Sequence, residues 1–548
     1  MSTPSAKLII LGLDGASWRI LNPLLNSGIM PNLKSVISKG AYSILNSTIP
    51  PVTGSAWPVI ATGLNPGKLG AYDFYNRLNL DDFSLYPVRS HVIRGQTFWD
   101  YFSEKGYRIG VFGYPLLIPA YEINGWMVAG LGGSSFQKWA WPRRVQDQID
   151  KIAGPFSFTV SYGRKKYKNN LPRLISDIWS YYLGQISALE YLLDMYPVDI
   201  LITVFGVTDF ICHTMWHIWD QTHPLYDQKL SAEFMPLVLE LWSEIDRGIG
   251  KILKHLSPAG HIICLSDHGF GKSFGVFHTN TWLESNGFLR REISSTSLSN
   301  KIRAKIQNKL PSALYPILGY LAGTQIQQSL RASVLREIDL INSKAFALET
   351  TDIFGMIFLN RQYAIHRLLD EEEFVESTVC EICNLLEQYG EIENLEIVAF
   401  PSKCIYQGEY SCLAPEVLFQ VKESQVSVSY RFSDSIYDHR QHLPMKTGTH
   451  RLEGIFIGSG PKFKLNKSLE SPLSVLDVTP TLYHLLDEPI PANLDGHIAL
   501  DAILPEFHSY SIKGYEENYS PVDDIKDLST KMDNGDMKKR LQDLGYLD

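Results

Sequence analysis

The sequence predicts an α/β protein with a mostly parallel sheet and helices on both faces. Short, continuous apolar runs end in Gly or Asp, and segments with helical periodicity lie between them. Continuous apolar runs of this length are typical of strands buried on both faces, and regular alternation with helices favours a parallel sheet. The length, 548 residues, suits one large α/β domain with insertions, or two domains.

The elements follow in order along the chain. We expect strands at residues 7–15, 108–115, 199–209, 260–269 and 453–460, and helices at residues 30–39, 96–105, 233–255 and 475–486. Residues 136–173 and 291–340 break the alternation, and we interpret both as insertions that cap the sheet. The expected division is therefore 1–290 as the first part of the α/β core, 291–340 as a helical cap, 341–504 as the second part of the core, and 505–548 as a polar tail.

Composition restricts the class of protein. Hydrophobic residues make up 45% and charged residues 20%, which is typical of a globular chain. The net charge of −9 argues against nucleic acid as a partner but not against an anionic substrate, because bound metal ions invert the local field.

Six cysteines do not form a disulfide framework, and Cys380 and Cys383 lie in a helical apolar run that predicts a buried helix face. No signal peptide or apolar run of about 18 residues is present, so we expect a cytoplasmic protein without a transmembrane segment. Nothing indicates the oligomeric state.

Carboxylates and imidazoles gather at the strand ends. Asp14 ends the first strand, Asp209 ends the third with His213 four residues later, and Asp267 and His268 end the fourth. His450 precedes the last strand. Ligands bind outside the carboxyl ends of parallel strands, so these groups should converge. So many groups would repel one another without cations, and this mixture of oxygen and nitrogen suits zinc or manganese. Six such ligands are enough for two metal ions.

The segment at 50–67 offers two hydroxyls, Thr53 and Ser55. Thr53 is expected to begin a helix as its N-cap, with Ser55 in the first turn. Backbone N–H groups at a helix N-terminus would stabilise an alkoxide and an incoming phosphoryl group. On local sequence alone, an ordinary helix cap without chemistry is the favoured interpretation.

The motifs together resemble the alkaline phosphatase superfamily, and most closely its type I phosphodiesterase/nucleotide pyrophosphatase branch. The resemblance covers roughly residues 7–289 and 339–503. It rests on LGLDG with Asp14, a T-x-x-x-W-x-x-x-x-T-G pattern from Thr53 to Gly63, D-x-x-x-H at Asp209, SDHG at 266–269, THRxEGIFIGSGP from Thr449, and DVTPTLYHLL…DG from Asp477. Each motif alone is weak, but their order and spacing are specific.

The resemblance implies an alkaline-phosphatase-like fold with two divalent metal ions, zinc or alternatively manganese. One ion would be held by Asp14, Thr53, Asp267 and His268, and the other by Asp209, His213 and His450. The family's nucleophilic threonine precedes the threonine of a TG pair by nine residues, which selects Thr53 over Ser55. A metal-bound Thr53 oxygen would be an alkoxide near neutral pH and would form a phospho-threonine intermediate.

The substrate is less clearly indicated. The family's nucleotide pyrophosphatases place a phosphate-binding asparagine about 21 residues after the nucleophile, where this chain has Phe74, flanked by Asp73 and Asn76. Gly54 replaces the expected aromatic residue for base stacking. The candidate substrate contacts are Asp73, Asn76, Trp57, His278 and Arg451.

Several functions stay open at this point. The leading expectation is a phosphodiesterase that acts on a phosphorylated small molecule. A phosphomonoesterase, phosphonate hydrolase or phosphotransferase on the same core is the enzymatic alternative, and a scaffold that binds a phosphorylated ligand is the non-enzymatic one. A basic amphipathic start to the 291–340 segment leaves a lipid-linked substrate open as well.

Overall fold

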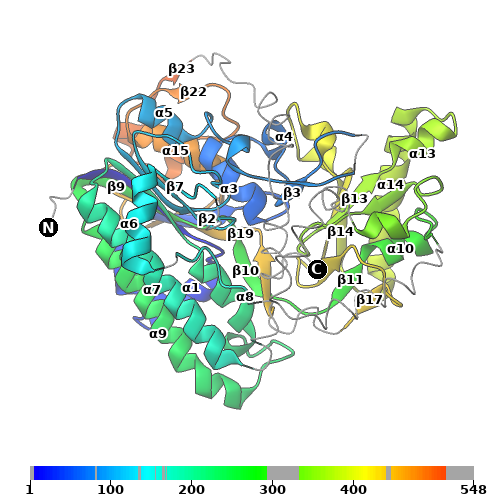
Figure 1. Ribbon diagram of the computed structural model, residues 1–548, viewed down its shortest axis with the longest axis horizontal. Coiled ribbons are helices and arrows are strands. Elements are labelled where there is room, and N and C mark those ends of the chain that lie inside the picture. The colour runs from blue at the N-terminus through cyan, green and yellow to red at the C-terminus, as the bar shows by residue number, and fades with distance from the viewer. Residues whose placement is uncertain are drawn as a thin grey trace.

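The computed structural model describes residues 5–80, 83–133, 137–154, 156–162, 167, 170–292, 333–439 and 446–513. Its centre is a ten-stranded sheet (Figure 1). The strand order is β20 (Lys467–Ser468), β2 (Gly40–Asn46), β19 (Glu453–Ser459), β9 (Leu256–Leu265), β1 (Ala6–Leu13), β8 (Ile200–Phe205), β5 (Ile109–Tyr114), β6 (Gly125–Ala129) and β7 (Ala140–Trp141), with β21 (Leu473–Ser474) also paired to β2.

The sheet is mostly parallel, as the sequence predicts. β1 pairs in parallel with β8 on one side and β9 on the other, with Leu8 opposite Ile200 and His261. β5 continues the parallel part beside β8. β19 is different, because it runs antiparallel to both β9 and β2. The start of β19 therefore lies at the same edge of the sheet as the carboxyl ends of β1 and β9.

Helices cover both faces of this sheet, which explains why its central strands are apolar throughout (Figure 1). One face carries α1 (Trp18–Asn26), α2 (Pro31–Ser38), α6 (Arg143–Ala153), α7 (Leu171–Met195), α8 (Val207–Trp219) and α9 (Gln228–Leu253). The other face carries α3 (Thr53–Thr62), α5 (Phe98–Glu104) and α15 (Val478–Leu485). The predicted α/β class with helices on both faces is confirmed.

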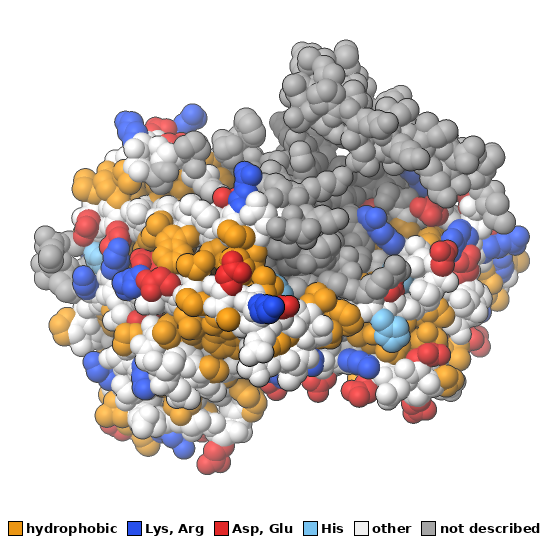
Figure 2. Space-filling model, turned by 90° about the horizontal axis from the view of Figure 1, so that it is seen from below, with side chains coloured by type: hydrophobic (Ala, Val, Ile, Leu, Met, Phe, Trp, Pro, Cys, Tyr) orange, Lys and Arg blue, Asp and Glu red, His pale blue; other side chains and the backbone are white. Residues whose placement is uncertain are grey.

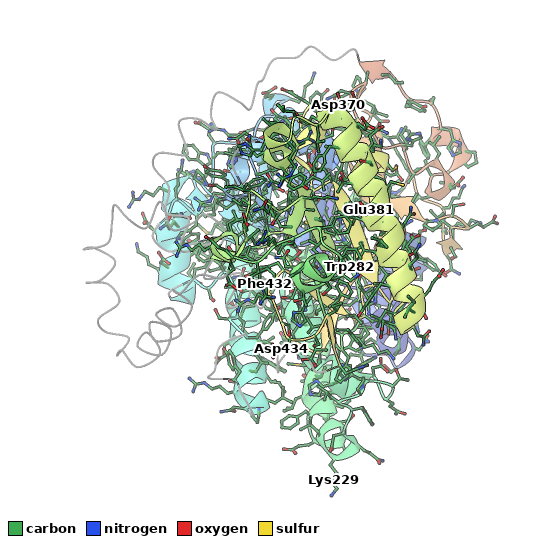
Figure 3. The ribbon with its side chains drawn as sticks, turned by 90° about the vertical axis from the view of Figure 1, so that its right-hand side faces the viewer. Lys229, Trp282, Asp370, Glu381, Phe432 and Asp434 are labelled. Atoms are coloured by element: carbon green, nitrogen blue, oxygen red, sulfur yellow. The ribbon has the colours of Figure 1, made fainter. Side chains whose placement is uncertain are left out.

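Residues 345–421 form a second, four-stranded antiparallel sheet that the sequence analysis did not anticipate. Its order is β12 (Ala345–Ala347), β13 (Gly355–Leu359), β15 (Val417–Val421) and β14 (Ile397–Pro401). α13 (Arg361–His366) and α14 (Glu371–Glu393) accompany it, and Figure 3 shows α14 running from Asp370 past Glu381 along the outside. Asp370 caps α14 by accepting a hydrogen bond from the Glu373 backbone N–H. This part has its own hydrophobic cluster, so we call the described residues 273–292, 333–439 and 446–447 the second lobe.

The second lobe leaves and rejoins the core at one place. β10 (Gly269–Lys272) pairs antiparallel with β18 (Gly448–Arg451), and Lys272 lies opposite Gly448. Inside the lobe, β11 (Val276–His278) lies between β16 (Ser427–Ser429) and β17 (Tyr437–Asp438), and α10 (Thr279–Ser285) follows β11. The buried Arg77–Glu416 ion pair, at 2.9 Å, is a further tie between core and lobe.

The remaining elements are short. They are α4 (Pro66–Leu69), β3 (Tyr75–Asn76), β4 (Tyr86–Pro87), β22 (Ile490–Pro491), β23 (Ile512–Lys513) and the 3₁₀ turns at Ser90–Val92, Ser333–Glu337, Ser402–Cys404, Ser411–Leu413, Val475–Asp477, Leu500–Ala502 and Pro505–Phe507. Most of the expected cap, residues 293–332, and the tail from residue 514 lie outside the described residues. The boundaries expected from the sequence stay a prediction.

The surface is mixed in character. On the face in Figure 2, acidic, basic and hydrophobic side chains are interspersed over the described residues. Among the helices that the structure describes, none is both long enough and apolar enough to cross a membrane. Cys380 and Cys383 lie on α14 as expected, but only Cys383 is buried, so the predicted buried helix face is wrong for Cys380, which is exposed.

Candidate metal centre

Four segments bring the predicted ligands to one edge of the central sheet. Asp14 follows β1, and Asp267 and His268 follow its neighbour β9. His450 lies in β18, just before the antiparallel β19. Asp209 was expected to end a strand, but β8 ends at Phe205 and Asp209 lies in the first turn of α8. The chain turns into the helix at Gly206, so Asp209 and His213 face the site one helical turn apart.

The first cluster consists of Asp209, His213 and His450. The Nε2 atoms of His213 and His450 are 3.0 Å apart, and Asp209 Oδ1 lies 3.3 Å from the first and 3.5 Å from the second. Both histidines are fully buried, and Asp209 is nearly so. The three ligand atoms lie within 4.8 Å of one another, close enough to share one metal ion.

The second cluster lies directly beside the first. His268 Nε2 is 3.6 Å from Asp14 Oδ1, 3.3 Å from Asp267 Oδ2 and 3.3 Å from Thr53 Oγ1. Asp14, Asp209 and His268 also offer ligand atoms within 4.8 Å of one another, so Asp209 borders both clusters. The rings of His268 and His450 stack with centroids 3.5 Å apart. The two groups therefore form one continuous centre.

Backbone carbonyls fix the tautomer of all three histidines. The Nδ1 atoms of His213, His450 and His268 face the carbonyl oxygens of Gly448 at 2.9 Å, Pro51 at 2.9 Å and Gly269 at 3.2 Å. A carbonyl oxygen only accepts, so each Nδ1 carries the proton and donates. Each Nε2 then presents a lone pair to the centre, which is the arrangement of metal-binding histidines.

Burial drives the titratable groups toward their neutral forms. Burial, with the charge of Asp267, holds the pKa of Asp14 well above its ordinary value, and burial raises the pKa of Asp267 to about 7. Burial lowers the pKa of His268 to about 3 and keeps the pKa values of His213 and His450 well below the ordinary range. Neutral imidazoles are what a metal ion requires as ligands.

The donor set fits divalent cations. Asp14 Oδ1 and Asp267 Oδ2 are buried and accept no hydrogen bond from the residues that the structure describes. Unsatisfied buried carboxylate oxygens are costly unless a cation faces them. His213 Nε2 and His450 Nε2 face each other with lone pairs, which is unfavourable without a positive charge between them. Oxygen and imidazole ligands of this kind suit zinc, with manganese as the alternative.

The two candidate hydroxyls have different surroundings. Thr53 is the first residue of α3 rather than its N-cap, because Val52 occupies the cap position. Thr53 is fully buried, and its Oγ1 faces His268. Ser55 points away and donates to the carbonyl of Ala71 at 2.7 Å. Of the two hydroxyls, therefore, only that of Thr53 contacts a candidate ligand.

Two of the predicted substrate contacts, Trp57 and Arg451, have hydrogen-bond partners at the centre, and their assignment as substrate contacts stays a prediction. The Trp57 indole N–H donates to Asp14 Oδ2 at 3.2 Å and so orients that carboxylate. The Arg451 guanidinium donates to the carbonyls of Ser424, His450 and Lys272, which fastens β18 to β10 and to the lobe. Burial lowers the pKa of Arg451 to about 9.

The other three predicted contacts also have protein partners. Asp73 Oδ2 accepts from the backbone N–H and hydroxyl of Thr351, at 2.7 and 3.0 Å. Asn76 Oδ1 accepts from the backbone N–H of Tyr72 at 2.9 Å. His278 Nδ1 lies 3.3 Å from the Arg431 carbonyl, within the lobe. Their assignment as substrate contacts stays a prediction.

Sequence reasoning missed three polar groups beside the centre. Lys446 forms a buried ion pair with Asp352, and its charge contributes to the low pKa values of His213 and His450. Tyr162 lies with its ring 5.6 Å from that of His213. Lys446 precedes His450 by four residues, a spacing that could have been noticed, but Tyr162 and Asp352 lie in segments without a motif.

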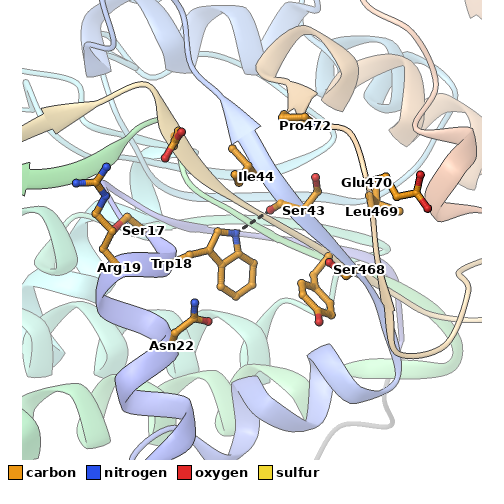
Figure 4. Close-up of a pocket in the computed structure, with 12 residues that line it drawn as sticks. Ser17, Trp18, Arg19, Asn22, Ser43, Ile44, Ser468, Leu469, Glu470 and Pro472 are labelled. Atoms are coloured by element: carbon orange, nitrogen blue, oxygen red, sulfur yellow. Dashed lines mark hydrogen bonds between the residues drawn. The ribbon is translucent and has the colours of Figure 1, made fainter. Parts of the chain in front are cut away.

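A separate cavity of about 300 Å³ lies near the start of α1 (Figure 4). Trp18 is one of the residues that line it, and its indole N–H donates to the Ser43 carbonyl at 2.9 Å. None of the candidate metal ligands lines this cavity.

Comparison with known families identifies the class. The family model described as Type I phosphodiesterase / nucleotide pyrophosphatase matches residues 8–326, more than half of the chain. The protein is thus a phosphoester hydrolase of the alkaline phosphatase superfamily. Within that superfamily the chain belongs to the type I phosphodiesterase/nucleotide pyrophosphatase family, which is metal-dependent, and the resemblance seen in the motifs is confirmed.

Among solved structures, the chain is similar to phosphonoacetate hydrolase from Sinorhizobium meliloti 1021 in complex with phosphonoformate. The identity is 14%, the match covers 87% of this chain and 94% of that one, and the TM-score is 0.49. No curated protein sequence matches the chain.

Proposed function

We propose that the protein is a two-metal phosphodiesterase of the nucleotide pyrophosphatase type, which acts through a phospho-threonine intermediate on Thr53. The observation that carries this proposal is the position of Thr53. Its Oγ1 lies 3.3 Å from His268 Nε2, at the first residue of a helix and beside both ligand clusters. Asp14, Thr53, Asp267 and His268 would hold one ion, and Asp209, His213 and His450 the other.

Two divalent cations would lower the pKa of the Thr53 hydroxyl, stabilise the leaving oxygen and supply activated water. The Thr53 hydroxyl gives up its proton and Oγ1 attacks phosphorus, so that the Oγ1–P bond forms, the P–O bond to the leaving group breaks, and the leaving oxygen departs as an alcohol after taking up a proton. Water then attacks phosphorus on the opposite side from Thr53, the Oγ1–P bond breaks, and Thr53 recovers its proton. The N-terminal end of α3 favours the negative phosphoryl group held there.

The chain's own residues preserve this geometry. Carbonyl oxygens hold each imidazole in one tautomer, and Trp57 holds Asp14. Gly54 leaves no room for a side chain next to Thr53, since an added Cβ would lie 2.6 Å from the Phe74 backbone nitrogen. Thr53 would therefore act from a tightly packed segment at the start of α3, which restrains its hydroxyl for in-line attack.

A monoesterase, phosphonate hydrolase or phosphotransferase is the second candidate. Phe74 is fully buried and apolar at the position where the family's nucleotide pyrophosphatases bind phosphate through an asparagine. A nucleotide substrate is therefore less favoured than a phosphorylated small molecule of another kind. We expect the site to be filled by zinc, with manganese as the alternative, and we expect the protein to act in the cytoplasm.

The test uses purified protein, chelated and then reloaded with zinc or manganese. Turnover of bis-(p-nitrophenyl) phosphate and p-nitrophenyl phosphate is compared in wild type, Thr53→Ala and Ser55→Ala. Ser55→Ala is the matched control, because it removes a neighbouring hydroxyl that only bonds to Ala71. Metal-dependent diester cleavage that is lost in Thr53→Ala and kept in Ser55→Ala would support the proposal.

Three other outcomes would change the proposed function. A preference for the monoester would favour the second candidate. Full turnover in Thr53→Ala would refute the nucleophile. Binding of two metal ions without turnover of either ester would favour a phospho-ligand-binding scaffold.

A further inference from the structure

The Tyr162 side chain is buried beside the metal centre with an unsatisfied hydroxyl. Tyr162 is 1% exposed, and its hydroxyl has no hydrogen-bond partner among the described residues. Its ring packs against Phe210 and His213, both on α8, with centroids 6.2 and 5.6 Å apart. Leaving a buried hydroxyl unpaired is costly, so such a group in a folded protein calls for a ligand or water.

The negative charges that act on this hydroxyl belong to the centre and its surroundings. Burial, followed by the negative charges of Asp209, Asp352 and Asp14, holds the pKa of Tyr162 well above its ordinary value. Two of these aspartates are candidate metal ligands. A phenol hydroxyl is protonated at neutral pH in any case, and the packing of the Tyr162 ring on His213 puts it beside the centre, where it can donate a hydrogen bond.

A fixed cation lies on the same side. Lys446 pairs with Asp352, and Asp352 also accepts a hydrogen bond from Ser427 Oγ at 3.0 Å. Lys446 is 2% exposed at the end of the second lobe, four residues before His450. Its charge acts on both His213 and His450. The side of the centre nearest the first cluster thus combines a neutral donor with a positive charge.

We propose that Tyr162 donates a hydrogen bond to a non-bridging phosphoryl oxygen of the substrate beside Asp209, His213 and His450, and that Lys446 faces the same oxygen. This inference rests on the proposed function, since it names how the same site recognises its phosphoryl group. Hydrogen bonds to an anionic oxygen are short and strong. They also strengthen as charge develops on that oxygen in the transition state. Tyr162 and Lys446 would replace the phosphate contact that Phe74 cannot make.

The test is Tyr162→Phe in the zinc-loaded full chain. Because the hydroxyl has no hydrogen-bond partner among the residues that the structure describes, its removal should leave zinc content unchanged and leave Tm unchanged or higher. The Kd for orthophosphate should rise about 10–100-fold, with a similar fall in kcat/KM. Tyr75→Phe is the matched control. Tyr75 also has a buried hydroxyl without a partner in the described chain, but the charges that act on it are those of Arg89 and Glu349.

A second variant guards against a purely structural effect. Lys446→Gln combined with Asp352→Asn removes both charges and leaves no buried ion unpaired, and it should also weaken orthophosphate binding about tenfold or more. Orthophosphate affinity within twofold of wild type in Tyr162→Phe, with zinc still bound, would overturn the inference. Loss of zinc or a lower Tm in Tyr162→Phe would overturn it as well, because the hydroxyl would then have a structural role. Failure of wild type to bind zinc, or full turnover in Thr53→Ala, would instead refute the proposed function itself.

Discussion

The hydrogen bond from Trp57 to Asp14 predicts a specific loss of metal affinity. In Trp57→Phe, Asp14 Oδ2 loses the indole N–H at 3.2 Å, while an aromatic ring still fills most of the space beside Gly12 and Tyr114. Removing a partner that orients a metal ligand typically costs about 10–100-fold in affinity, or about 1.4–2.8 kcal/mol. The smaller ring also leaves a cavity that costs about 1–2 kcal/mol of unfolding free energy.

Trp99→Phe separates these two effects. Trp99 is equally buried and packs against the same Tyr114, with centroids 4.9 Å apart. Its indole donates to the Tyr121 hydroxyl at 2.8 Å and contacts no metal ligand. Both variants should lose a similar amount of Tm in the chelated state, and only Trp57→Phe should lose metal affinity.

The assay is zinc competition with a chromophoric chelator at pH 7.5, with Tm measured on chelated and loaded protein. The zinc Kd of Trp57→Phe should exceed that of Trp99→Phe by about 10-fold or more. Equal zinc affinity in the two variants would refute the role of Trp57 in orienting Asp14. So would a loss of affinity that merely follows the loss of Tm.

Three further outcomes follow from contacts of single residues. Asp246 on α9 accepts hydrogen bonds from the backbone N–H groups of Asn32 and Leu33 and so caps α2. Asp246→Ala should therefore lower the free energy of unfolding, measured with urea, by about 2–4 kcal/mol without changing zinc content. A decrease below about 1 kcal/mol would contradict this. Gly54→Ala should lower kcat/KM about 10–100-fold, because the new Cβ would collide with main-chain atoms and move the Thr53 hydroxyl. Gly184→Ala is the control and should leave kcat/KM unchanged, because no atom lies within 4 Å of a Cβ added there. The zinc Kd should rise about tenfold for each pH unit below 7, because Asp267 holds a proton there that must leave on binding. The pKa of Asp267 is raised from 3.8 to about 7 on folding, so its contribution to the stability of the chelated protein should fall as pH rises from about 4 to 7 and level off above 7. The pKa of His268 is lowered to about 3, so its contribution is lost in the opposite direction, as pH falls from about 6.5, and the effect of Asp267 is separable from that of His268 between pH 6.5 and 7.5. A flat zinc titration between pH 6 and 7.5 would exclude this linkage.

The parts of the fold that were predictable are those with a periodic signal. β1, β5, β8, β9 and β19 are continuous apolar runs, and their burial on both faces is what produces such runs. Most of the six candidate ligands were predictable because they flank strands whose ends meet at one edge, whereas Asp209 and His213 lie on α8. This geometric rule also holds for His450, since β19 is antiparallel and begins where the others end.

Other features depend on tertiary contacts that leave no trace in local sequence. Asp209 follows an apolar run that has the pattern of a strand. The strand ends before Gly206, however, and the apolar residues after it form the buried face of α8. The strands of the second lobe are three to five residues long, too short for a periodic pattern to stand out. Tyr162 lies in an irregular segment, and only packing against α8 brings it to the centre.

The pairing of β10 with β18 has a consequence for how such a protein diversifies. The chain departs for the second lobe at Lys272 and is back at Gly448, directly across the ladder. An inserted segment whose two ends lie side by side can be lengthened, shortened or exchanged without moving the candidate ligands of the core. Only the two connections between the segment and the core have to be preserved. Asp14, Asp209, Asp267 and His268 all precede the departure, and His450 follows the return by two residues. Evolution can therefore change the lobe that carries Asp352 almost independently of the candidate metal ligands.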